Sequence, residues 1–292
     1  MVDPMRETSA PRSIVVGVDG SKAAIRAALW AIDEALSRDL LLRLVYAIEP
    51  GDAAQGPEHA ARKLAVGETA TREAVMAIEA TNKPVKIEVE IDQDRPVSAL
   101  IRASRPAAMI CVGAVGFHHF QPGRVGSTAA AIAASAHCPV AIIHTHEGGH
   151  ARSDPGWIVV EADNSPHTGV LLEAAMEEAR LRNAPLRIIT CWQSRISDIR
   201  GSEGVADTNR RVQAELDRRL SRWTHHYPDL DVQSVALHGS LIDYLAENVH
   251  SVQLVVVGAR DHRTVQQLVG PSGYAALRHT NCSVLVVDHQ HL

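Results

Sequence analysis

The sequence contains few aromatic residues, no cluster of basic residues and no apolar run of membrane-spanning length. Phe, Trp and Tyr together make up 3% of the 292 residues, and the formal net charge is −5. Nucleic-acid-binding surfaces are basic and often combine aromatic side chains with Lys and Arg. A membrane helix needs roughly 18 consecutive apolar residues. We therefore expect neither a nucleic-acid partner nor a membrane segment.

The N-terminus lacks the features of a secretion signal, and the cysteines lack paired spacing. Asp3, Arg6 and Glu7 interrupt the first twelve residues, where a signal peptide would carry an apolar core. Each cysteine lies in or beside an apolar run, and no Cys-x-x-Cys pair occurs. The four are Cys111, Cys138, Cys191 and Cys282. We expect buried thiols without redox chemistry and a cytoplasmic protein.

The chain contains two similar halves, offset by 144 positions. The run Ser13–Asp19 resembles Trp157–Asp163, so that Asp19 corresponds to Asp163. At the same offset Ala31-x-x-Glu34-Ala35 matches Ala175-x-x-Glu178-Ala179, Gly126 matches Gly270, and Cys138-x-Val140 matches Cys282-x-Val284. A period this long indicates a duplicated domain, because solenoid repeats run about 20–50 residues.

Two domains of about 140 residues fit the length of the chain. We place them at residues 1–147 and 156–292. The stretch from 146 to 155 is polar and rich in glycine, which is typical of a linker. Its histidines leave metal binding as an alternative, but no framework of cysteines or carboxylates accompanies them, and we expect no metal site.

Each half alternates short apolar runs with helix-type segments. The apolar runs are at 13–19, 40–47, 85–91, 108–113 and 139–144, and again near 157–162, 186–192, 231–237, 253–258 and 283–287. The helix-type segments are at 21–38, 58–81, 97–104 and 125–136, and near 165–182, 206–226, 241–249 and 271–279. Strands that are apolar throughout, such as Ile14–Val16, predict a parallel sheet covered by helices on both faces. Right-handed crossovers then predict a doubly wound three-layer sandwich.

The stretch from Gly113 to Thr128 indicates a phosphate-binding loop. A buried apolar run, Met109–Val112, precedes it, and an alanine-rich helix-forming run follows. Glycine at the strand exit lets the backbone approach a ligand. Residues Gly126 to Thr128 stand at a helix start, where N–H groups and the helix dipole favour an anion. An ordinary strand-to-helix loop is the alternative.

Asp19 stands at the end of the first strand, next to this loop in the expected sheet. In an open α/β sheet the ligand lies beyond the carboxyl ends of the strands, where the winding reverses. The Asp19 carboxylate can accept hydrogen bonds from a ribose hydroxyl or an adenine amino group, or it can cap the helix that begins near Ser21. Both roles stay open, and we expect Asp19 and the loop to form one site.

The spacing Gly113-x2-Gly116-x9-Gly126-Ser127 resembles the ATP-binding signature of the universal stress protein family, G-x2-G-x9-G-[S/T]. Two further features resemble that family. The first strand ends in Asp19-Gly20-Ser21, and His137-Cys138-Pro139-Val140 leads into the last strand. Both halves match in order, as in tandem-domain members from actinobacteria. The resemblance implies two flavodoxin-like (Rossmann-like) domains. Each would be a five-stranded parallel sheet of order 3-2-1-4-5 between helices, with ATP over its C-terminal edge.

The resemblance implies an ATP site, with or without magnesium, in the first half. Asp19 and the backbone near Ala47 would hold the adenine and ribose, residues 113–119 would wrap the ribose and phosphates, and residues 126–128 would bind the phosphates. Arg124 would either add positive charge or remain a solvated surface arginine. The implied contacts are Gly17, Asp19, Ala47, Gly113, Ala114, Val115, Gly116, Phe117, His118, His119, Arg124, Gly126, Ser127 and Thr128.

The second half departs from the signature. Asp261 stands where the second glycine belongs, eight residues separate it from Gly270, and Pro271 replaces the serine, which removes an N–H donor. Glu161 replaces Gly17. Each added carboxylate near a triphosphate costs on the order of 1 kcal/mol, which neighbouring basic residues would offset in part. The surviving contacts are Asp163, Gly258, Gly270 and Ser272. We expect weaker nucleotide binding in this half, or none.

The sequence holds no evident group for consuming ATP, because it has no Gly-Lys-Ser/Thr P-loop. His118 and His119 fall in the phosphate-facing loop, where they would act as acid–base groups or only contact the ligand. We predict that ATP is held rather than consumed, and that the protein is a regulator in stress response or growth adaptation, not an enzyme. The alternatives are a slow ATPase or nucleotidyl-transfer enzyme on the same fold, and a nucleotide-free interaction module.

The expected partners are an adenine nucleotide and a regulatory protein. Val140–Ile143 and Val284–Val287 form the apolar last strand of each half, and an unpaired apolar edge strand promotes association. Last strands of family members often pair with each other. We therefore expect these two strands to pair around a pseudo-two-fold axis within the chain, and a homodimer of chains stays open.

Overall fold

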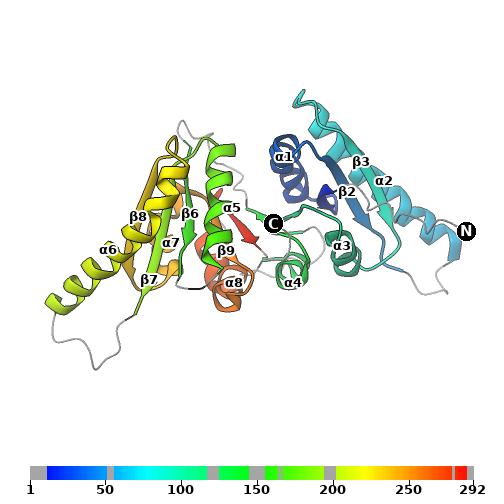
Figure 1. The fold of residues 1–292 in the computed structure, drawn as a ribbon. Coiled ribbons are helices and arrows are strands. Elements are labelled where there is room, and N and C mark those ends of the chain that lie inside the picture. The colour runs from blue at the N-terminus through cyan, green and yellow to red at the C-terminus, as the bar shows by residue number, and fades with distance from the viewer. Residues whose placement is uncertain are drawn as a thin grey trace, which may run out of the picture.

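The two halves of the protein lie side by side (Figure 1). The structure is a computed structural model, and it describes residues 12–50, 56–116, 125–144, 155–163, 165, 167–193, 202–277 and 280–287. In Figure 1 the first half, blue to green, occupies the right, and the second half, green to red, occupies the left. No helix among these residues is long and apolar enough to cross a membrane.

Strands and helices alternate regularly in the first half. Its elements are β1 (Ser13–Val18), α1 (Lys22–Ser37), β2 (Leu41–Ala47), α2 (Gly56–Glu79), β3 (Ile87–Asp92), α3 (Pro96–Ser104), β4 (Met109–Gly113), α4 (Ser127–Ser135) and β5 (Val140–Ile143). Every predicted strand and helix of this half is present, with small differences at the ends.

The second half repeats this order with one additional helix. Its elements are β6 (Trp157–Glu161), α5 (Thr168–Leu181), β7 (Leu186–Trp192), α6 (Ser202–His226), β8 (Val232–His238), α7 (Leu241–Asn248), the short 3-10 helix η2 (Val249–Ser251), β9 (Val252–Gly258), α8 (His262–Val269), α9 (Pro271–Leu277) and β10 (Ser283–Val287). Helix α8 is the addition, because the sequence led us to expect an irregular segment between Asp261 and Gly270. Helix α6 also begins earlier than predicted.

The ten strands of the described residues form one sheet, in the order β3-β2-β1-β4-β5-β10-β9-β6-β7-β8. Within each half the neighbouring strands are parallel and follow the predicted order 3-2-1-4-5. This is the order of the Rossmann fold, whereas flavodoxin itself has 2-1-3-4-5, so the likeness to flavodoxin extends to the layers but not to the strand order.

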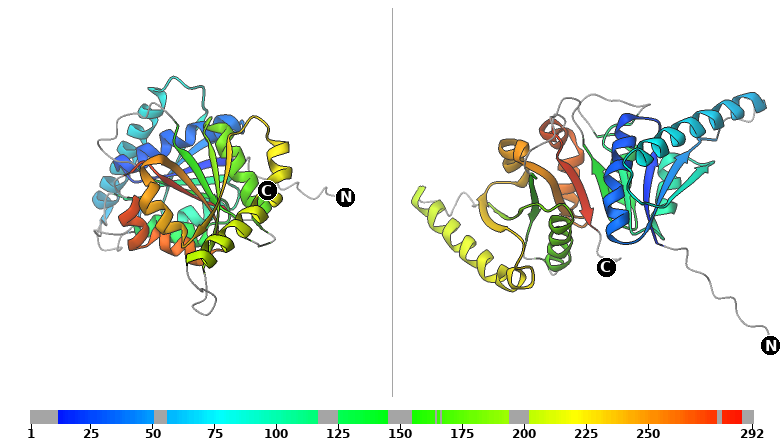
Figure 2. Two further views of the ribbon diagram at one scale, coloured as in Figure 1. Left: turned by 90° about the vertical axis from the view of Figure 1, so that its left-hand side faces the viewer. Right: turned by 90° about the horizontal axis from the view of Figure 1, so that it is seen from above.

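The two halves are joined at the centre of the sheet. Strands β5 and β10 are antiparallel, with Ile142 opposite Val284 and Val140 opposite Val286. The predicted pairing of the last strands is therefore confirmed, and it converts two five-stranded sheets into one. Figure 2 shows the consequence: α2 and α6 are at opposite ends of the molecule, and the red β10 lies at the junction. Because each strand covers the other's edge, neither apolar edge is left open.

Helices cover both faces of the sheet and bury its apolar side chains. Along β1, Ile14 and Val16 pack with α1 and α2, while Val15 points to the face covered by α3 and α4. All three side chains are fully buried. The same division continues in the second half, where α5 and α6 cover the first face and α7, α8 and α9 the second. This burial on both faces is the reason why the strands are apolar throughout.

Candidate functional site

The candidate site of the first half lies at the carboxyl ends of β1 and β4, which are neighbours in the sheet. Val16 of β1 is opposite Cys111 of β4, so both strands end at the same edge. Asp19 follows β1, and Gly116 follows β4. A Cβ placed on Gly116 would be 2.6 Å from Oδ2 of Asp19. The structure therefore brings together the two parts that the sequence predicted to meet.

Asp19 shapes the turn before α1 but is not its cap. Oδ1 of Asp19 accepts a hydrogen bond from the N–H of Ser21 at 3.0 Å. The N-cap of α1 is Ser21, whose Oγ accepts from the N–H of Ala24 at 3.1 Å. Between them, Gly20 has φ +81°, a conformation that glycine adopts without strain. The alternative in which Asp19 caps the helix is thus wrong, and its Oδ2 is directed toward Gly116.

The start of α4 closes against the end of β4. The N–H of Gly126 donates to the carbonyl of Ala114 at 2.8 Å. Gly126 is the N-cap of α4, and no side chain among the described residues caps this helix. Ser127 and Thr128 form its first turn, with the Ser127 side chain exposed. Within the described part of the chain no side chain accepts from the N–H groups of this turn, which is what the phosphate-loop interpretation requires.

Two of the predicted site glycines are explained by packing. A Cβ on Gly113 would be 2.7 Å from the backbone carbonyl carbon of Ala23, in the first turn of α1. A Cβ on Gly17 would be 3.0 Å from the Leu100 side chain of α3. Both glycines thus let a helix approach the sheet closely, and their contact with a nucleotide stays a prediction, as do those of Ala47 and Val115.

Tyr46 belongs to this region, and the sequence analysis missed it. It is the residue before Ala47 in β2, and a Cβ on Gly67 of α2 would be only 2.8 Å from its ring. Burial raises the pKa of Tyr46, and the negative charge of Asp19 raises it further. The phenol ring therefore lies near the candidate carboxylate. A tyrosine at the end of an otherwise aliphatic strand was the available signal.

Asp92-x-Asp94 at the end of β3 is a second pattern that the sequence analysis missed. Two carboxylates in this spacing can hold a metal ion. Here Arg102 of α3 pairs with both of them, at 2.8 Å from its Nη1 to Oδ2 of Asp94. Hydrogen bonds from Arg102 and from the backbone of Arg95 lower the pKa of Asp94. No group of three or more metal-binding side chains occurs within the described ranges.

Four predicted contacts lie outside the described residues. They are Phe117, His118, His119 and Arg124. The roles predicted for the two histidines and for the arginine therefore stay predictions. Most of the predicted linker between the halves also lies outside the described residues.

In the second half, a helix occupies the position of the phosphate loop. Asp261 is the N-cap of α8, and its Oδ1 accepts from the N–H of Thr264 at 3.0 Å. The turn into α9 is tight, since a Cβ on Gly273 would be 2.1 Å from the carbonyl oxygen of Leu268. Gly270 belongs to the same turn, with a Cβ position 2.6 Å from the carbonyl oxygen of Gln266. Asp261 and Gly270 therefore serve two consecutive helices in place of the loop that we expected, and weaker nucleotide binding in this half stays a prediction.

At the strand ends of this half, Asp163 is hydrogen-bonded to neighbouring residues and Glu161 is affected by burial. Oδ1 of Asp163 accepts from the N–H of Ser165 at 3.0 Å and from Oγ1 of Thr168 at 2.5 Å. Burial opposes the effect of these bonds, but together they lower the pKa of Asp163. Burial raises the pKa of Glu161, and the charges of Asp261 and Asp163 add to this. The edge is therefore acidic, which disfavours a phosphate. The nucleotide contacts of Gly258 and Ser272 stay predictions.

A cavity of about 480 Å³ in the second half lies between α5 and α6, and Ala162 and Ser165, on either side of Asp163, are part of its lining. Leu172, Leu216 and Trp223 line its apolar wall, and Arg219 lines its polar side. Nη2 of Arg219 donates to the carbonyl of Asp163 at 2.6 Å. The polar group nearest to the strand end is thus already engaged within the protein.

Fold and site together define a tandem α/β protein with Rossmann-type halves, in the second of which helix α8 follows the fourth strand. The model of the universal stress protein family matches residues 11–144 and again 157–288, so the chain belongs to this family.

Relatives of the same length support this assignment. Universal stress protein Rv2028c of Mycobacterium tuberculosis is 57% identical over 291 residues, which is 99% of this chain and all of that protein. Universal stress protein Rv2624c of the same organism is 41% identical over 276 residues, covering 94% of this chain and 96% of that one. The crystal structure of a universal stress protein from Archaeoglobus fulgidus has the same fold, with a TM-score of 0.66 at 18% identity, covering 94% and 96%.

Proposed function

We propose that the first half binds ATP at the edge formed by Asp19, the chain after β4 and the start of α4. The observation that carries this proposal is the approach of Gly116 to Asp19, which puts a carboxylate beside a glycine backbone. A ribose hydroxyl or an adenine amino group would donate to the carboxylate. The phosphates would follow the backbone from Gly116 to α4, whose first N–H groups have no side-chain cap in the described structure.

The nucleotide would be held rather than consumed. Each group placed at this edge supplies a binding contact, and binding alone does not lower a reaction barrier. We propose a cytoplasmic regulator of stress response or growth adaptation in which ATP favours one conformation. Such regulation requires that the two conformations differ in their affinity for ATP.

Only the first half would bind ATP tightly. In the second half, α8 fills the place of the loop and the carboxylates of Glu161 and Asp163 remain close to the strand ends. A triphosphate there would meet negative charge and a capped helix. One strong site per chain is the expected stoichiometry.

Calorimetric titration of the full chain with ATP, with and without magnesium, tests this proposal. The wild-type protein should bind one ATP, and Asp19→Asn should weaken binding about tenfold or more, because hydrogen bonds to a charged group contribute about 1.5–3 kcal/mol. The matched control is Asp163→Asn in the second half, which should leave the affinity unchanged. Absence of binding to the wild-type chain, or equal losses in both variants, would contradict the proposed site.

A separate measurement addresses consumption of the nucleotide. Purified protein incubated with labelled ATP and magnesium should return the label as ATP. If the wild-type chain releases labelled ADP and the Asp19→Asn variant does not, the protein is an enzyme instead.

A further inference from the structure

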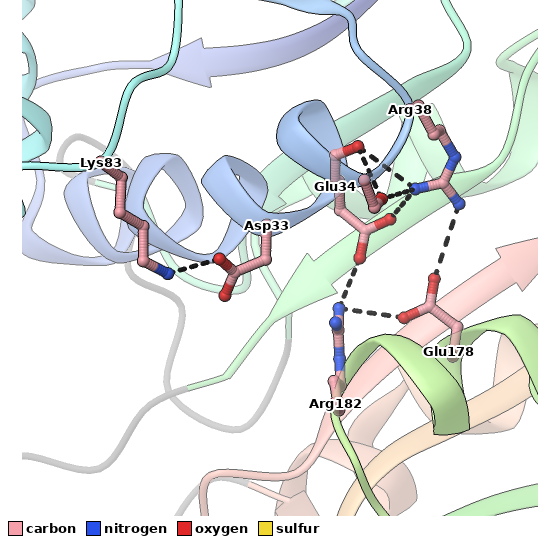
Figure 3. Close-up of polar contacts among 7 residues, drawn as sticks. Asp33, Glu34, Arg38, Lys83, Glu178 and Arg182 are labelled. Carbon is pink, nitrogen blue, oxygen red and sulfur yellow. Dashed lines mark hydrogen bonds and ion pairs between the residues drawn. The ribbon is translucent and has the colours of Figure 1, made fainter. Parts of the chain in front are cut away.

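Four charged residues meet where helices α1 and α5 pack across the junction of the two halves (Figure 3). Glu34 lies in α1 and Glu178 in α5, and Arg38 and Arg182 are the C-cap residues of these two helices. Glu34 corresponds to Glu178, and Arg38 to Arg182, at the repeat offset of 144. The group is therefore related to itself by the pseudo-two-fold axis of the chain, and we call it the junction cluster.

The two carboxylates of the junction cluster are neighbours and are buried. Their side chains are 0% and 2% exposed. Nη2 of Arg182 is 2.6 Å from Oε1 of Glu34 and 3.0 Å from Oε2 of Glu178, so one nitrogen contacts both. The two carboxylates are therefore held next to each other, on either side of one guanidinium nitrogen and away from bulk water.

The arginines are placed unequally around the pair. Arg182 is 11% exposed, and its guanidinium carbon lies 4.2 Å from the centre of the Trp30 ring. Arg38 is 30% exposed, pairs closely with Glu34 and has its Nη2 3.9 Å from Oε1 of Glu178. Glu178 thus has one well-placed cation, whereas Glu34 has two. Figure 3 shows both arginines directed at Glu34.

Burial and like charge both oppose the ionised form of Glu178. Burial contributes most and the charge of Glu34 adds to it, so that the pKa of Glu178 rises to about 8 even though Arg182 and Arg38 act to lower it. The charged and titratable groups that face the pair are the C-cap residues Arg38 and Arg182, Glu177 of α5, and Cys111 of β4. Burial keeps the Cys111 thiol neutral by raising its pKa.

We propose that Glu34 and Glu178 share one proton at neutral pH, and that loss of this proton loosens the contact of α1 with α5, which makes the junction of the two halves a pH-sensitive switch. With the proton in place, the pair carries a single negative charge against two arginines. Without it, two buried carboxylates repel each other at the distance set by one shared guanidinium. The helices that carry them must then separate or admit water.

The direction of the effect follows from the raised pKa of Glu178. A carboxyl whose pKa is higher in the folded protein than in the unfolded chain stabilises the fold fully below its ordinary pKa, near 4.5. That stabilisation falls as the pH rises and is gone above about 8. Between these values the unfolding equilibrium constant should rise by up to about tenfold per pH unit. The change within the folded protein should instead have its midpoint near pH 8.

The test compares three single variants with the wild-type chain. Glu178→Gln and Glu34→Gln replace a carboxyl by a neutral group of the same shape. The matched control is Asp33→Asn, on the same helix, which breaks the exposed pair with Lys83. Urea unfolding is measured from pH 5 to pH 9, and Trp30 fluorescence is followed as the difference between each protein and its Trp30→Phe counterpart.

The wild type and Asp33→Asn should lose stability relative to Glu178→Gln as the pH rises from 5 to 8, and the Trp30 signal should change near pH 8. Hydrogen exchange in α1 and α5 should accelerate over the same range only when both carboxyls are present. A wild-type Trp30 signal that is flat from pH 6 to 9 would overturn the proposal. So would equal pH dependence in the wild type and both Gln variants. The wild-type Trp30 signal requires no change of either carboxyl, so it decides the matter even if a Gln variant does not fold.

Discussion

Gly116 lies so close to Asp19 that a Cβ on residue 116 would be 2.6 Å from the Oδ2 atom of the aspartate. The other carboxylate oxygen is already held by the N–H of Ser21 at 3.0 Å. The carboxylate therefore has one oxygen in the turn before α1 and one at the edge of the sheet. Its orientation depends on the absence of a side chain at position 116.

Substitution of Gly116 by Ala should displace the Asp19 carboxylate with little effect on stability, because the nearest atom is the end of a side chain. We expect ATP affinity to fall about tenfold or more, in line with the loss of a charged hydrogen bond. Titration calorimetry and thermal unfolding on the same samples measure both effects. Gly258→Ala is the matched control, since a Cβ there meets nothing within 4 Å. Unchanged affinity in Gly116→Ala would mean that Asp19 does not hold the ligand.

Substitution of Asp261 by Ala should destabilise the second half without creating a nucleotide site. Its carboxylate caps α8 through the N–H of Thr264, and loss of such a cap costs about 0.5–2 kcal/mol. Urea unfolding should show this loss, and amide exchange should accelerate in residues 262–269. Ser21→Ala, which removes the cap of α1, is the comparison in the first half.

The competing explanation for Asp261 makes the opposite prediction. If its carboxylate only repelled phosphate, the Ala variant would keep its stability and gain a second ATP site in calorimetry. A stoichiometry of two with an unchanged unfolding midpoint would therefore exclude the capping role.

Local sequence patterns were sufficient for most of the fold. Apolar runs and helix-forming segments identified every strand, and the repeat at offset 144 placed the two halves in order. Helix α8 was missed because Asp261 was interpreted as a lost glycine of the signature. The same residues carry the helix signal: an aspartate at the N-cap, followed by Val265 and Leu268 on one face. For residues 261–269, the helix signal in the local sequence predicts the structure better than the glycine spacing of the family signature.

The candidate site was predicted only where it follows the strand ends. Asp19 and the glycine loop meet because β1 and β4 are neighbours, which the strand order dictates. The contact of Tyr46 with Gly67 depends on how α2 lies on β2, and no local pattern reports that. Glu34 and Glu178 were visible as a repeated motif, but a glutamate within a helix is normally exposed. Their burial follows from the packing of the two halves, which is a tertiary property.

His144, at the end of β5, should make the protein less stable in acid. It is buried, and neither ring nitrogen makes a hydrogen bond of normal geometry within the described residues. Burial lowers its pKa to about 4, although the backbone of Ile142 acts to raise it. A histidine with a lowered folded pKa stabilises the fold above its ordinary pKa near 6.5, and this contribution is lost as the pH falls toward 4.

Substitution of His144 by Leu should abolish that acid dependence. The wild-type chain should lose up to about 3 kcal/mol of unfolding free energy between pH 6.5 and 4 through this one group, and the variant should not. Urea unfolding at half-unit pH steps measures the difference, with His225→Leu, an exposed histidine of α6, as the control. Equal acid sensitivity in all three proteins would show that His144 is not the group responsible. Because His144 acts from pH 6.5 down to about 4 and Glu178 from pH 4.5 up to about 8, their opposite contributions should largely cancel where the two ranges overlap.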